Sequence, residues 1–416
     1  MGLASKLFKG DRVIWVIFIF LCLISVIEVF SATSTLAYKN SNLWMPIIRH
    51  TGFLVGGLIV ILILLNIHYR WFRLMVLLVP VSIILLIVTP LVGISANDAY
   101  RWLSFGGVQI QPSELAKLGS IVFVAFMLSK RRLFTDNQIF WWTLFAVVVT
   151  CALILPENLS TAFILFVVCY SLMFIGQVPF VKWFLVAIVL LLVVGAFFAS
   201  WFVVPEQVWK ELPVLDRVPT WKKRIAVKSD ENTFDAKELF NGDNYQVTHA
   251  KIAIARGGIS PQGPGHGKQR DFLPQAYSDF IYAIIIEELG LWVGGLGVLL
   301  LYMWLLIRVG MIARKCDELF PKFLVLGCGL SLVVQALVNM AVAVDLMPVT
   351  GQPMPLVSRG GTSTIISCVY IGIILSISRF SAHTGDEDEE DEQPLEVKEP
   401  SEVPLMEGTS QVEAKA

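Results

Sequence analysis

The chain has 416 residues, of which 56% are apolar and 16% are charged. Soluble domains are about half apolar and about a quarter charged, so a mean hydropathy of +0.71 indicates a membrane protein. Residues 386–416 hold twelve acids and two bases, and the remaining 30 bases and 21 acids give residues 1–385 a net charge of +9. These bases lie between apolar runs, which excludes a nucleic-acid binder. The high hydropathy excludes a soluble enzyme and a secreted scaffold as interpretations of the whole chain.

Apolar runs long enough to cross a bilayer recur along the chain. A spanning helix needs about 20 mostly apolar residues, with roughly 17–25 tolerated. Ten runs qualify: 13–32, 51–67, 73–93, 113–129, 139–155, 159–176, 183–204, 280–306, 323–344 and 360–380. We therefore expect an all-α integral membrane protein with ten transmembrane helices. The first run follows three bases, as a signal peptide would, but its length and the nine later runs favour an uncleaved helix.

The Lys and Arg residues of the short loops predict the orientation, because cytoplasmic loops carry an excess of them. One side has fourteen: Lys6, Lys9, Arg12, Arg70, Arg73, Lys130, Arg131, Arg132, Lys182, Arg308, Arg314, Lys315, Lys322 and Arg379. The other side has four: Lys39, Arg49, Arg101 and Arg359. We expect the first side to be cytoplasmic, with both termini inside, which agrees with an even number of spans.

Two segments lie outside the spans. Residues 205–279, between spans seven and eight, form an extracytoplasmic loop far longer than the usual connection. Its mixed charge, its aromatic residues and the Gly/Pro run 257–267 favour a partly ordered structure over the membrane face. Residues 386–416 begin with seven consecutive acids and hold few large apolar residues, so we expect a disordered cytoplasmic tail. Residues 1–385 then form one polytopic membrane domain.

The first polar cluster lies at the outer end of span four, where a stretch beginning at Arg101 leads into Gln111-Pro112-Ser113-Glu114-Leu115-Ala116-Lys117. With Pro112 in the first turn, Glu114 and Lys117 share one helix face. A helix cap and a snorkelling lysine would explain them structurally. A charge inside a span costs at least ~2.5–3.5 kcal/mol, however, and normally faces a cavity or a partner, which favours a functional pair.

Asp279 stands at the start of span eight, where the helix dipole favours an acid. A helix-terminal acid without further function is the simpler interpretation of this residue taken alone. Glu287 and Glu288 follow two turns deeper in the same span. One could face the interior and the other pair with a base, and we assign neither to the site.

The third polar segment, residues 348–362, combines prolines and glycines with Ser358 and Arg359. This composition indicates a re-entrant or extended loop, which is tolerated at membrane depth only when it is buried or lines a cavity. An ordinary tight turn is the alternative. All three segments lie on the outer face, and together they describe a site for an amphiphilic anionic ligand.

These stretches resemble the SEDS family (shape, elongation, division and sporulation) of polytopic peptidoglycan glycosyltransferases. The similarity covers about residues 10–380, and three motifs carry it. They are Arg101-Trp102 with residues 111–117, Leu273-Pro274 through Ser278-Asp279-Phe280-Ile281-Tyr282-Ala283 with Glu287-Glu288-Leu289-Gly290, and residues 348–361. The motif at the start of span eight is highly specific. The acidic tail lies outside the similarity.

The chain departs from the family pattern at three places. Asn158 stands where the family usually has an acid between spans five and six, so a charge there would have to come from Glu157. Ser278 replaces the usual Thr before the signature Asp and keeps the hydroxyl. Arg359 replaces the usual Tyr before the last Gly-Gly and adds a charge.

The resemblance implies that the substrate is lipid II and that the reaction extends a glycan strand with release of the lipid diphosphate. The family's essential acid then corresponds to Asp279, and its polar pair to Glu114 and Lys117. A sugar 4-hydroxyl is a poor nucleophile, so a carboxylate must take its proton during attack. The departing diphosphate needs cations, for which Lys117, Arg101 and Arg359 are candidates. A divalent ion such as Mg²⁺ or Mn²⁺ is a candidate cofactor.

Other functions remain open at this point. A lipid II flippase would also have polar residues among ten spans, although the one-sided polar cluster and the absence of an obvious repeat favour an enzyme. A scaffold that recruits cell-wall machinery through its acidic tail could coexist with either. Within the family the long tail favours a division-site enzyme over a lateral-wall enzyme. The implied partners are a class B penicillin-binding protein transpeptidase and other divisome proteins, at the septum of a bacterial cytoplasmic membrane.

Overall fold

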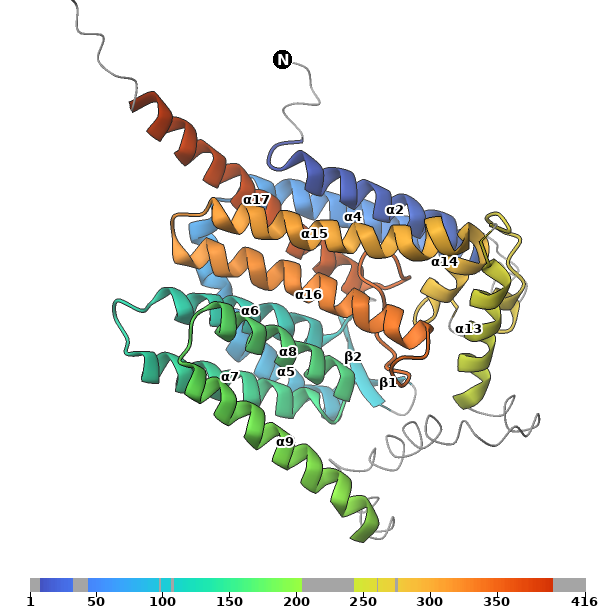
Figure 1. Cartoon of the computed structure of the whole chain (residues 1–416), viewed down its shortest axis with the longest axis horizontal. Coiled ribbons are helices and arrows are strands. Elements are labelled where there is room, and N and C mark those ends of the chain that lie inside the picture. The colour runs from blue at the N-terminus through green and yellow to red at the C-terminus, as the bar shows by residue number, and fades with distance from the viewer. Residues whose placement is uncertain are drawn as a thin grey trace, which may run out of the picture.

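The computed structural model describes residues 8–32, 44–96, 99–105, 108–203, 243–259, 261–273 and 276–391. All ten apolar runs form helices, and most of them lie roughly along the long axis of the molecule (Figure 1). In chain order they are α2 (Arg12–Ala32), α4 (Met45–Leu65), the 3-10 helix η1 (Tyr69–Leu77) with α5 (Leu78–Val92), α6 (Pro112–Ser129), α7 (Asp136–Ile154), α8 (Leu159–Ile175), α9 (Phe180–Val203), α14 (Ile281–Leu289) with the π-helical turn η3 (Gly290–Leu296) and α15 (Gly297–Arg314), α16 (Leu319–Ala343) and α17 (Thr362–Asp391).

Eight helical segments of the described chain are long and apolar enough to cross a membrane. Two further apolar helices, α8 and the 180–193 part of α9, are shorter. The prediction of a helical protein with many spans is therefore confirmed, whereas ten crossings stay a prediction. α6 and α16 are the most enclosed of these segments, which places them at the centre of the bundle.

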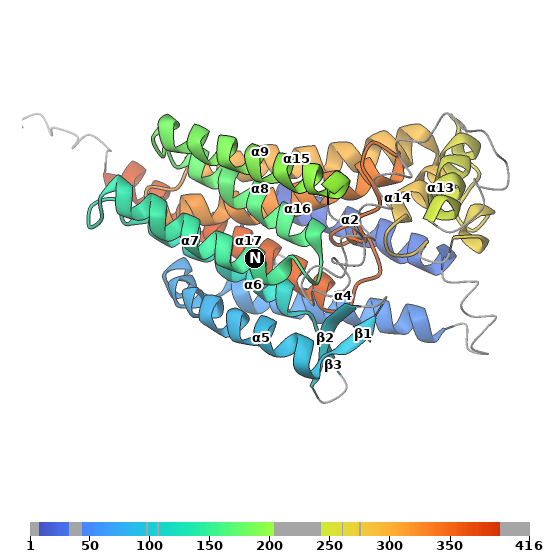
Figure 2. The same cartoon turned by 90° about the horizontal axis from the view of Figure 1, so that it is seen from below.

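The all-helical expectation is wrong between α5 and α6. There, β1 (Ile94–Ala96), β2 (Ala99–Phe105) and β3 (Val108–Ile110) form a three-stranded antiparallel sheet in that order. This segment is too short and too polar to span a bilayer. Because its residues are not helical, their backbone N–H and C=O groups find hydrogen-bond partners by pairing between strands. The sheet lies at the same end of the bundle as the connection from α16 to α17 (Figure 2).

Local sequence explains where several helices begin and end. Pro112 occupies the first turn of α6, where its missing N–H costs nothing. Thr135 and Gln138 form a capping box at the start of α7. Gly290 ends α14 with a φ of +78°, which a residue with a side chain rarely adopts, and the chain then continues through η3 into α15.

Three of the basic residues predicted to share one side lie near helix ends, where each contacts a different partner. Arg308 Nε contacts Asp11 Oδ2 at 2.6 Å, which joins α15 to the start of α2. Arg73 contacts Glu318, which precedes α16, at 2.7 Å. Arg379 Nη1 donates to the carbonyl of Leu65 at the end of α4 over 3.1 Å.

The expected domain boundaries fall partly outside the described residues. Within the expected loop 205–279, α13 (Asp243–Gly257) packs on α14, and η2 (Gln269–Asp271) follows it. Residues 204–242 lie outside the described residues. α17 continues to Asp391, so the tail boundary expected at 386 falls inside a helix, and residues 392–416 also lie outside the described residues.

Candidate functional site

Asp279 lies in the turn before α14, half-buried beside the connection from α16 to α17. Ser278 Oγ donates to Asp279 Oδ1 over 2.9 Å, and Asn339 Nδ2 donates to the Asp279 carbonyl over 3.0 Å. A Cβ added to Gly351 would lie 3.7 Å from Asp279 Oδ2, so this carboxylate oxygen faces a residue without a side chain. Gly351 also has a φ of +66°, which favours glycine there.

The connection from α16 to α17 is tied to the segment that carries Asp279. Ser358 Oγ donates to the Ser278 carbonyl over 2.6 Å and accepts from Met354 N over 2.7 Å. Arg359 N donates to the Tyr277 carbonyl over 2.9 Å, and the Arg359 guanidinium lies 5.1 Å from the centre of the Tyr277 ring. The buried Ser358 hydroxyl thus holds the backbone of the site together.

Glu114 and Lys117 form a buried ion pair inside the bundle. Lys117 Nζ lies 2.8 Å from Glu114 Oε1 and donates to Gln335 Oε1 on α16 over 2.9 Å. The Lys117 side chain is only 1% exposed. Its ammonium therefore contacts protein groups on two sides, because burial of an unpaired charge would be far costlier.

A chain of amide hydrogen bonds connects this ion pair with Asp279. Gln335 Nε2 donates to the Pro353 carbonyl over 2.9 Å, and Asn339 Nδ2 donates to the Gln352 carbonyl over 2.8 Å. Gln335 and Asn339 are four residues apart on α16 and therefore share a helix face. Through these two amides the Glu114–Lys117 pair, the connecting loop and Asp279 form one polar network.

The chain matches the cell cycle protein family, which groups FtsW, RodA and SpoVE, over residues 11–383. It belongs to the SEDS family. This SEDS protein is 29% identical over 380 residues to the probable peptidoglycan glycosyltransferase FtsW of Geobacter metallireducens, which covers 89% of this chain and 95% of the relative. It is 31% identical over 378 residues to the protein of the same name from Haemophilus influenzae, which covers 88% and 90%.

Two solved structures share the fold of this SEDS protein. A chain from a study of how a peptidoglycan synthase complex coordinates polymerization and crosslinking has a TM-score of 0.65 at 25% identity, covering 89% of this chain and 98% of that one. The rod shape-determining protein RodA of Thermus thermophilus has a TM-score of 0.59 at 23% identity, covering 89% and 97%. The family predicted from three motifs is thus confirmed, and the protein is a multi-pass membrane protein.

The remaining candidates of the SEDS protein have distinct positions. Arg101 lies on β2, and its side chain is not among those described. Asn158 caps α8, since its Oδ1 accepts from Ser160 N over 3.0 Å and Thr161 N over 3.3 Å. An aspartate could form the same cap, so the capping role alone does not explain the amide at this position. Glu157 beside it is buried.

Four polar residues of the network were missed in the sequence: Thr161, Gln335, Asn339 and Gln352. Gln352 Nε2 donates to Thr161 Oγ1 over 2.8 Å, which joins α8 to the connecting loop. A signal was present, because an amide inside an apolar span such as α16 is costly and normally has a polar partner. The partners could not be identified without the fold.

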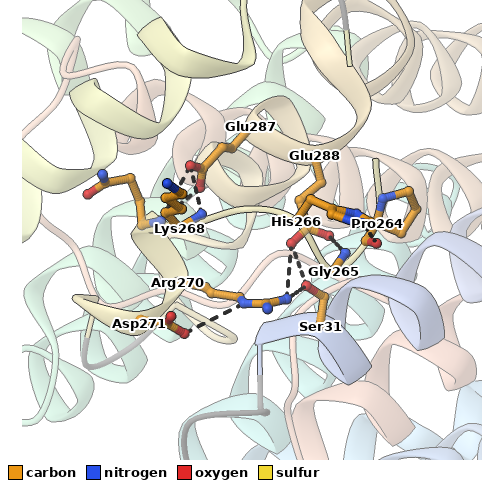
Figure 3. A network of polar contacts seen from close by, with 10 residues as sticks. Ser31, Pro264, Gly265, His266, Lys268, Arg270, Asp271, Glu287 and Glu288 are labelled. Atoms are coloured by element: carbon orange, nitrogen blue, oxygen red, sulfur yellow. Dashed lines mark hydrogen bonds and ion pairs between the residues drawn. The ribbon is translucent and has the colours of Figure 1, made fainter. Parts of the chain in front are cut away.

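A second buried network surrounds Glu287 and Glu288, the two acids that we did not assign to the site (Figure 3). Glu287 Oε1 accepts from Lys268 N over 3.0 Å, and Glu288 Oε2 accepts from Gly265 N over 2.9 Å. Glu288 Oε1 accepts from Ser31 Oγ on α2 and lies 3.5 Å from Arg270 Nη1. Both carboxylates therefore anchor the loop that follows α13, and the structure gives neither of them a contact with Asp279.

Proposed function

We propose that this SEDS protein is a peptidoglycan glycosyltransferase that polymerises lipid II at the outer face of the cytoplasmic membrane, with Asp279 as the general base. The observation that carries the proposal is the position of Asp279. Its carboxylate faces Gly351 while Ser278 and Asn339 bond its side chain and its backbone. Relatives of similar length that are named probable peptidoglycan glycosyltransferases support the reaction class.

In the proposed reaction the 4-hydroxyl oxygen of one sugar attacks the anomeric carbon of the other. A new C–O bond forms, the bond from the anomeric carbon to the diphosphate breaks, and the bonding electron pair leaves with the diphosphate. The hydroxyl proton passes to the Asp279 carboxylate as attack proceeds. Ser278 Oγ donates to Oδ1 of this carboxylate, and Oδ2 lies on the side of Gly351.

The buried ion pair has an indirect role in this proposal. Lys117 contacts Glu114 and Gln335 and is almost fully buried, so we propose that it fixes α16 and the connecting loop and does not itself hold the diphosphate. Glu114 pairs with the Lys117 ammonium and holds it in place. Arg101 and Arg359 remain the cations that we propose for the diphosphate, and Ser358 fixes the backbone beside them.

A divalent cation is a separate part of the proposal. Within the described ranges, no three His, Cys, Asp or Glu side chains gather where they could hold a metal ion. A Mg²⁺ ion that acts on phosphates is usually held by only one or two carboxylates together with the phosphates themselves. We propose that Mg²⁺ or Mn²⁺, where turnover requires it, arrives bound to the substrate diphosphate.

We also propose a division role, with both termini cytoplasmic and a class B penicillin-binding protein as the crosslinking partner. The relatives named FtsW support the division role. The positions of Arg308, Arg73 and Arg379 support the orientation, because each contacts a group at or beside the end of another helix. A structurally similar chain comes from a complex studied for polymerization and crosslinking, which supports such a partner.

The test is polymerisation of labelled lipid II by the purified chain with its transpeptidase partner present. We expect polymer from the wild type and none from Asp279→Asn, with unchanged expression and thermal unfolding of the variant. A chelator arm, with Mg²⁺ or Mn²⁺ added back, decides the metal requirement. Polymer from folded Asp279→Asn protein would refute the general base. Transport of labelled lipid II across vesicles without polymer would favour the flippase.

A further inference from the structure

The helices α4 and α17 run parallel, and the start of α17 lies beside the third turn of α4. A Cβ on Gly361 would lie 3.7 Å from Phe53 Cζ, and one on Gly372 would lie 3.3 Å from Ile61 Cα. Residue numbers therefore rise together along the two helices. Arg49 stands one helical turn before Phe53, so it lies beside the chain that immediately precedes Gly361.

Hydrogen bonds fix this arrangement from a third helix. His50 Nε2 lies 2.8 Å from Ser25 Oγ on α2, and Ser25 Oγ donates to the Val357 carbonyl over 2.7 Å. Because the single hydroxyl proton of Ser25 goes to Val357, His50 Nε2 must donate to Ser25. His50, next to Arg49, is thus connected through Ser25 to Val357, two residues before Arg359.

Arg49 and Arg359, called the arginine pair below, carry positive charge that the described residues do not neutralise. The Arg359 guanidinium lies over Tyr277, and the Arg49 guanidinium lies 6.0 Å from the centre of the Phe53 ring. No carboxylate of the described residues lies within ion-pair distance of either guanidinium. Burial lowers the pKa of Arg359 and the charge of Arg49 lowers it further, yet an arginine stays protonated in proteins.

The arginine pair also lies next to the proposed general base and to a helix start. Arg359 N donates to the carbonyl of Tyr277, two residues before Asp279. α17 begins three residues after Arg359, and its first N–H groups and dipole favour an anion. Thr362 Oγ1 at this helix start is buried and has no hydrogen-bond partner among the described residues.

We propose that the arginine pair binds the diphosphate of the polyprenyl-linked substrate beside Asp279. The inference rests on the proposed glycosyltransferase function and adds Arg49 to its binding site. Guanidinium groups match phosphate oxygens in a bidentate manner, and two of them suit a group that carries two phosphates. The rings of Tyr277 and Phe53 contact the two guanidinium groups without neutralising their charge. The charge of the departing diphosphate is then stabilised where it develops.

A phospholipid phosphate has the same recognition chemistry, so the test must separate the two ligands. Binding of undecaprenyl diphosphate is measured on the full-length Asp279→Asn protein in nanodiscs, which avoids turnover, with nanodiscs of zwitterionic lipid and of phosphatidylglycerol. Arg49→Gln and Arg359→Gln are compared with Arg132→Gln, an exposed arginine between α6 and α7. Arg49→Lys and Arg359→Lys keep the charge, and thermal unfolding verifies the fold of each protein.

We expect Arg49→Gln and Arg359→Gln each to weaken binding about tenfold, the change that loss of one charge-assisted hydrogen bond produces. The Lys variants should bind with intermediate affinity, and Arg132→Gln should match its parent. Unchanged diphosphate binding in folded Gln variants would overturn the proposal, as would an effect confined to phosphatidylglycerol.

A second measurement separates this inference from the proposed function. In the polymerisation assay, with Asp279 restored, the Gln variants should raise the KM for lipid II about tenfold, which corresponds to the same loss of binding. Absence of polymer from the wild type would refute the enzyme, while the binding comparison would still decide the arginine pair.

Discussion

Asn339 Nδ2 donates to the main-chain carbonyl of Asp279 over 3.0 Å and so joins the middle of the polar network to the proposed base. The same nitrogen donates to the Gln352 carbonyl over 2.8 Å. One amide therefore sets the distance between the turn before α14 and the connecting loop. Because Asn339 acts on the backbone of Asp279, it is a positioning residue.

Replacement of this amide should lower catalysis more than substrate binding. Asn339→Leu keeps the volume but leaves two carbonyls without a donor, at a cost of roughly 1–3 kcal/mol of stability for each that stays buried. We expect kcat to fall at least about tenfold, equivalent to about 1.4 kcal/mol, with a KM close to the wild type. Asn137→Leu, on the exposed start of α7, is the matched control. A normal kcat in folded Asn339→Leu enzyme would contradict the proposal that Asn339 positions Asp279.

The Glu114–Lys117 pair should show strong coupling in stability. Glu114→Gln leaves a buried ammonium without its carboxylate and should destabilise the protein by roughly 3–5 kcal/mol. Glu114→Gln combined with Lys117→Met should recover much of this loss, because no buried charge then remains. Thermal unfolding of the purified protein in detergent measures both effects.

Asp136→Asn is the control for this cycle, because the Asp136 side chain is 59% exposed and lies 3.9 Å from Arg131. This substitution should change stability by at most about 1 kcal/mol. Additive effects of the two substitutions at Glu114 and Lys117 would contradict the coupling, since residues in one ion pair should not behave independently.

Glu287 and Glu288 should determine the order of the loop between α13 and α14. Glu287→Gln and Glu288→Gln weaken charge-assisted hydrogen bonds to the backbone N–H groups of Lys268 and Gly265, each contributing about 1.5–3 kcal/mol. Hydrogen exchange across residues 261–273 should therefore accelerate. Asp271→Asn, at a side chain 53% exposed, should leave exchange unchanged. Equal exchange in wild type and both Gln variants would show that other contacts hold the loop.

The acidic tail should matter for recruitment and leave polymerisation intact. Because α17 continues to Asp391, a chain ending after Asp391 keeps this helix, and a chain ending after Gly385 shortens it. We expect both truncated chains to polymerise lipid II at the wild-type rate and to show weaker localisation at the septum by fluorescence microscopy. Loss of polymerisation in the chain that ends after Asp391 would assign the tail a catalytic role.

The sequence predicted which candidate segments lie near one another better than it predicted the partners of their side chains. Asp279 and residues 348–361 lie together as expected, because their motifs sit at helix ends on one face. Lys117, a candidate cation for the diphosphate, contacts Gln335, which lies 218 residues away in the chain. Its partner could not be read from the sequence, since neighbours on α6 say nothing about which helix lies opposite.

By itself, the sequence determined the helices, the family and the polar character of the segments at the helix ends. Apolar runs of bilayer length and local caps act over a few residues, so they can be identified without the fold. Only the tertiary structure decided which polar groups meet. Asn339 with Asp279, Glu288 with Ser31, and Arg49 beside the chain before α17 all come from elements distant in sequence. The physical reason is that buried polar groups must find partners wherever the packing of the helices places them.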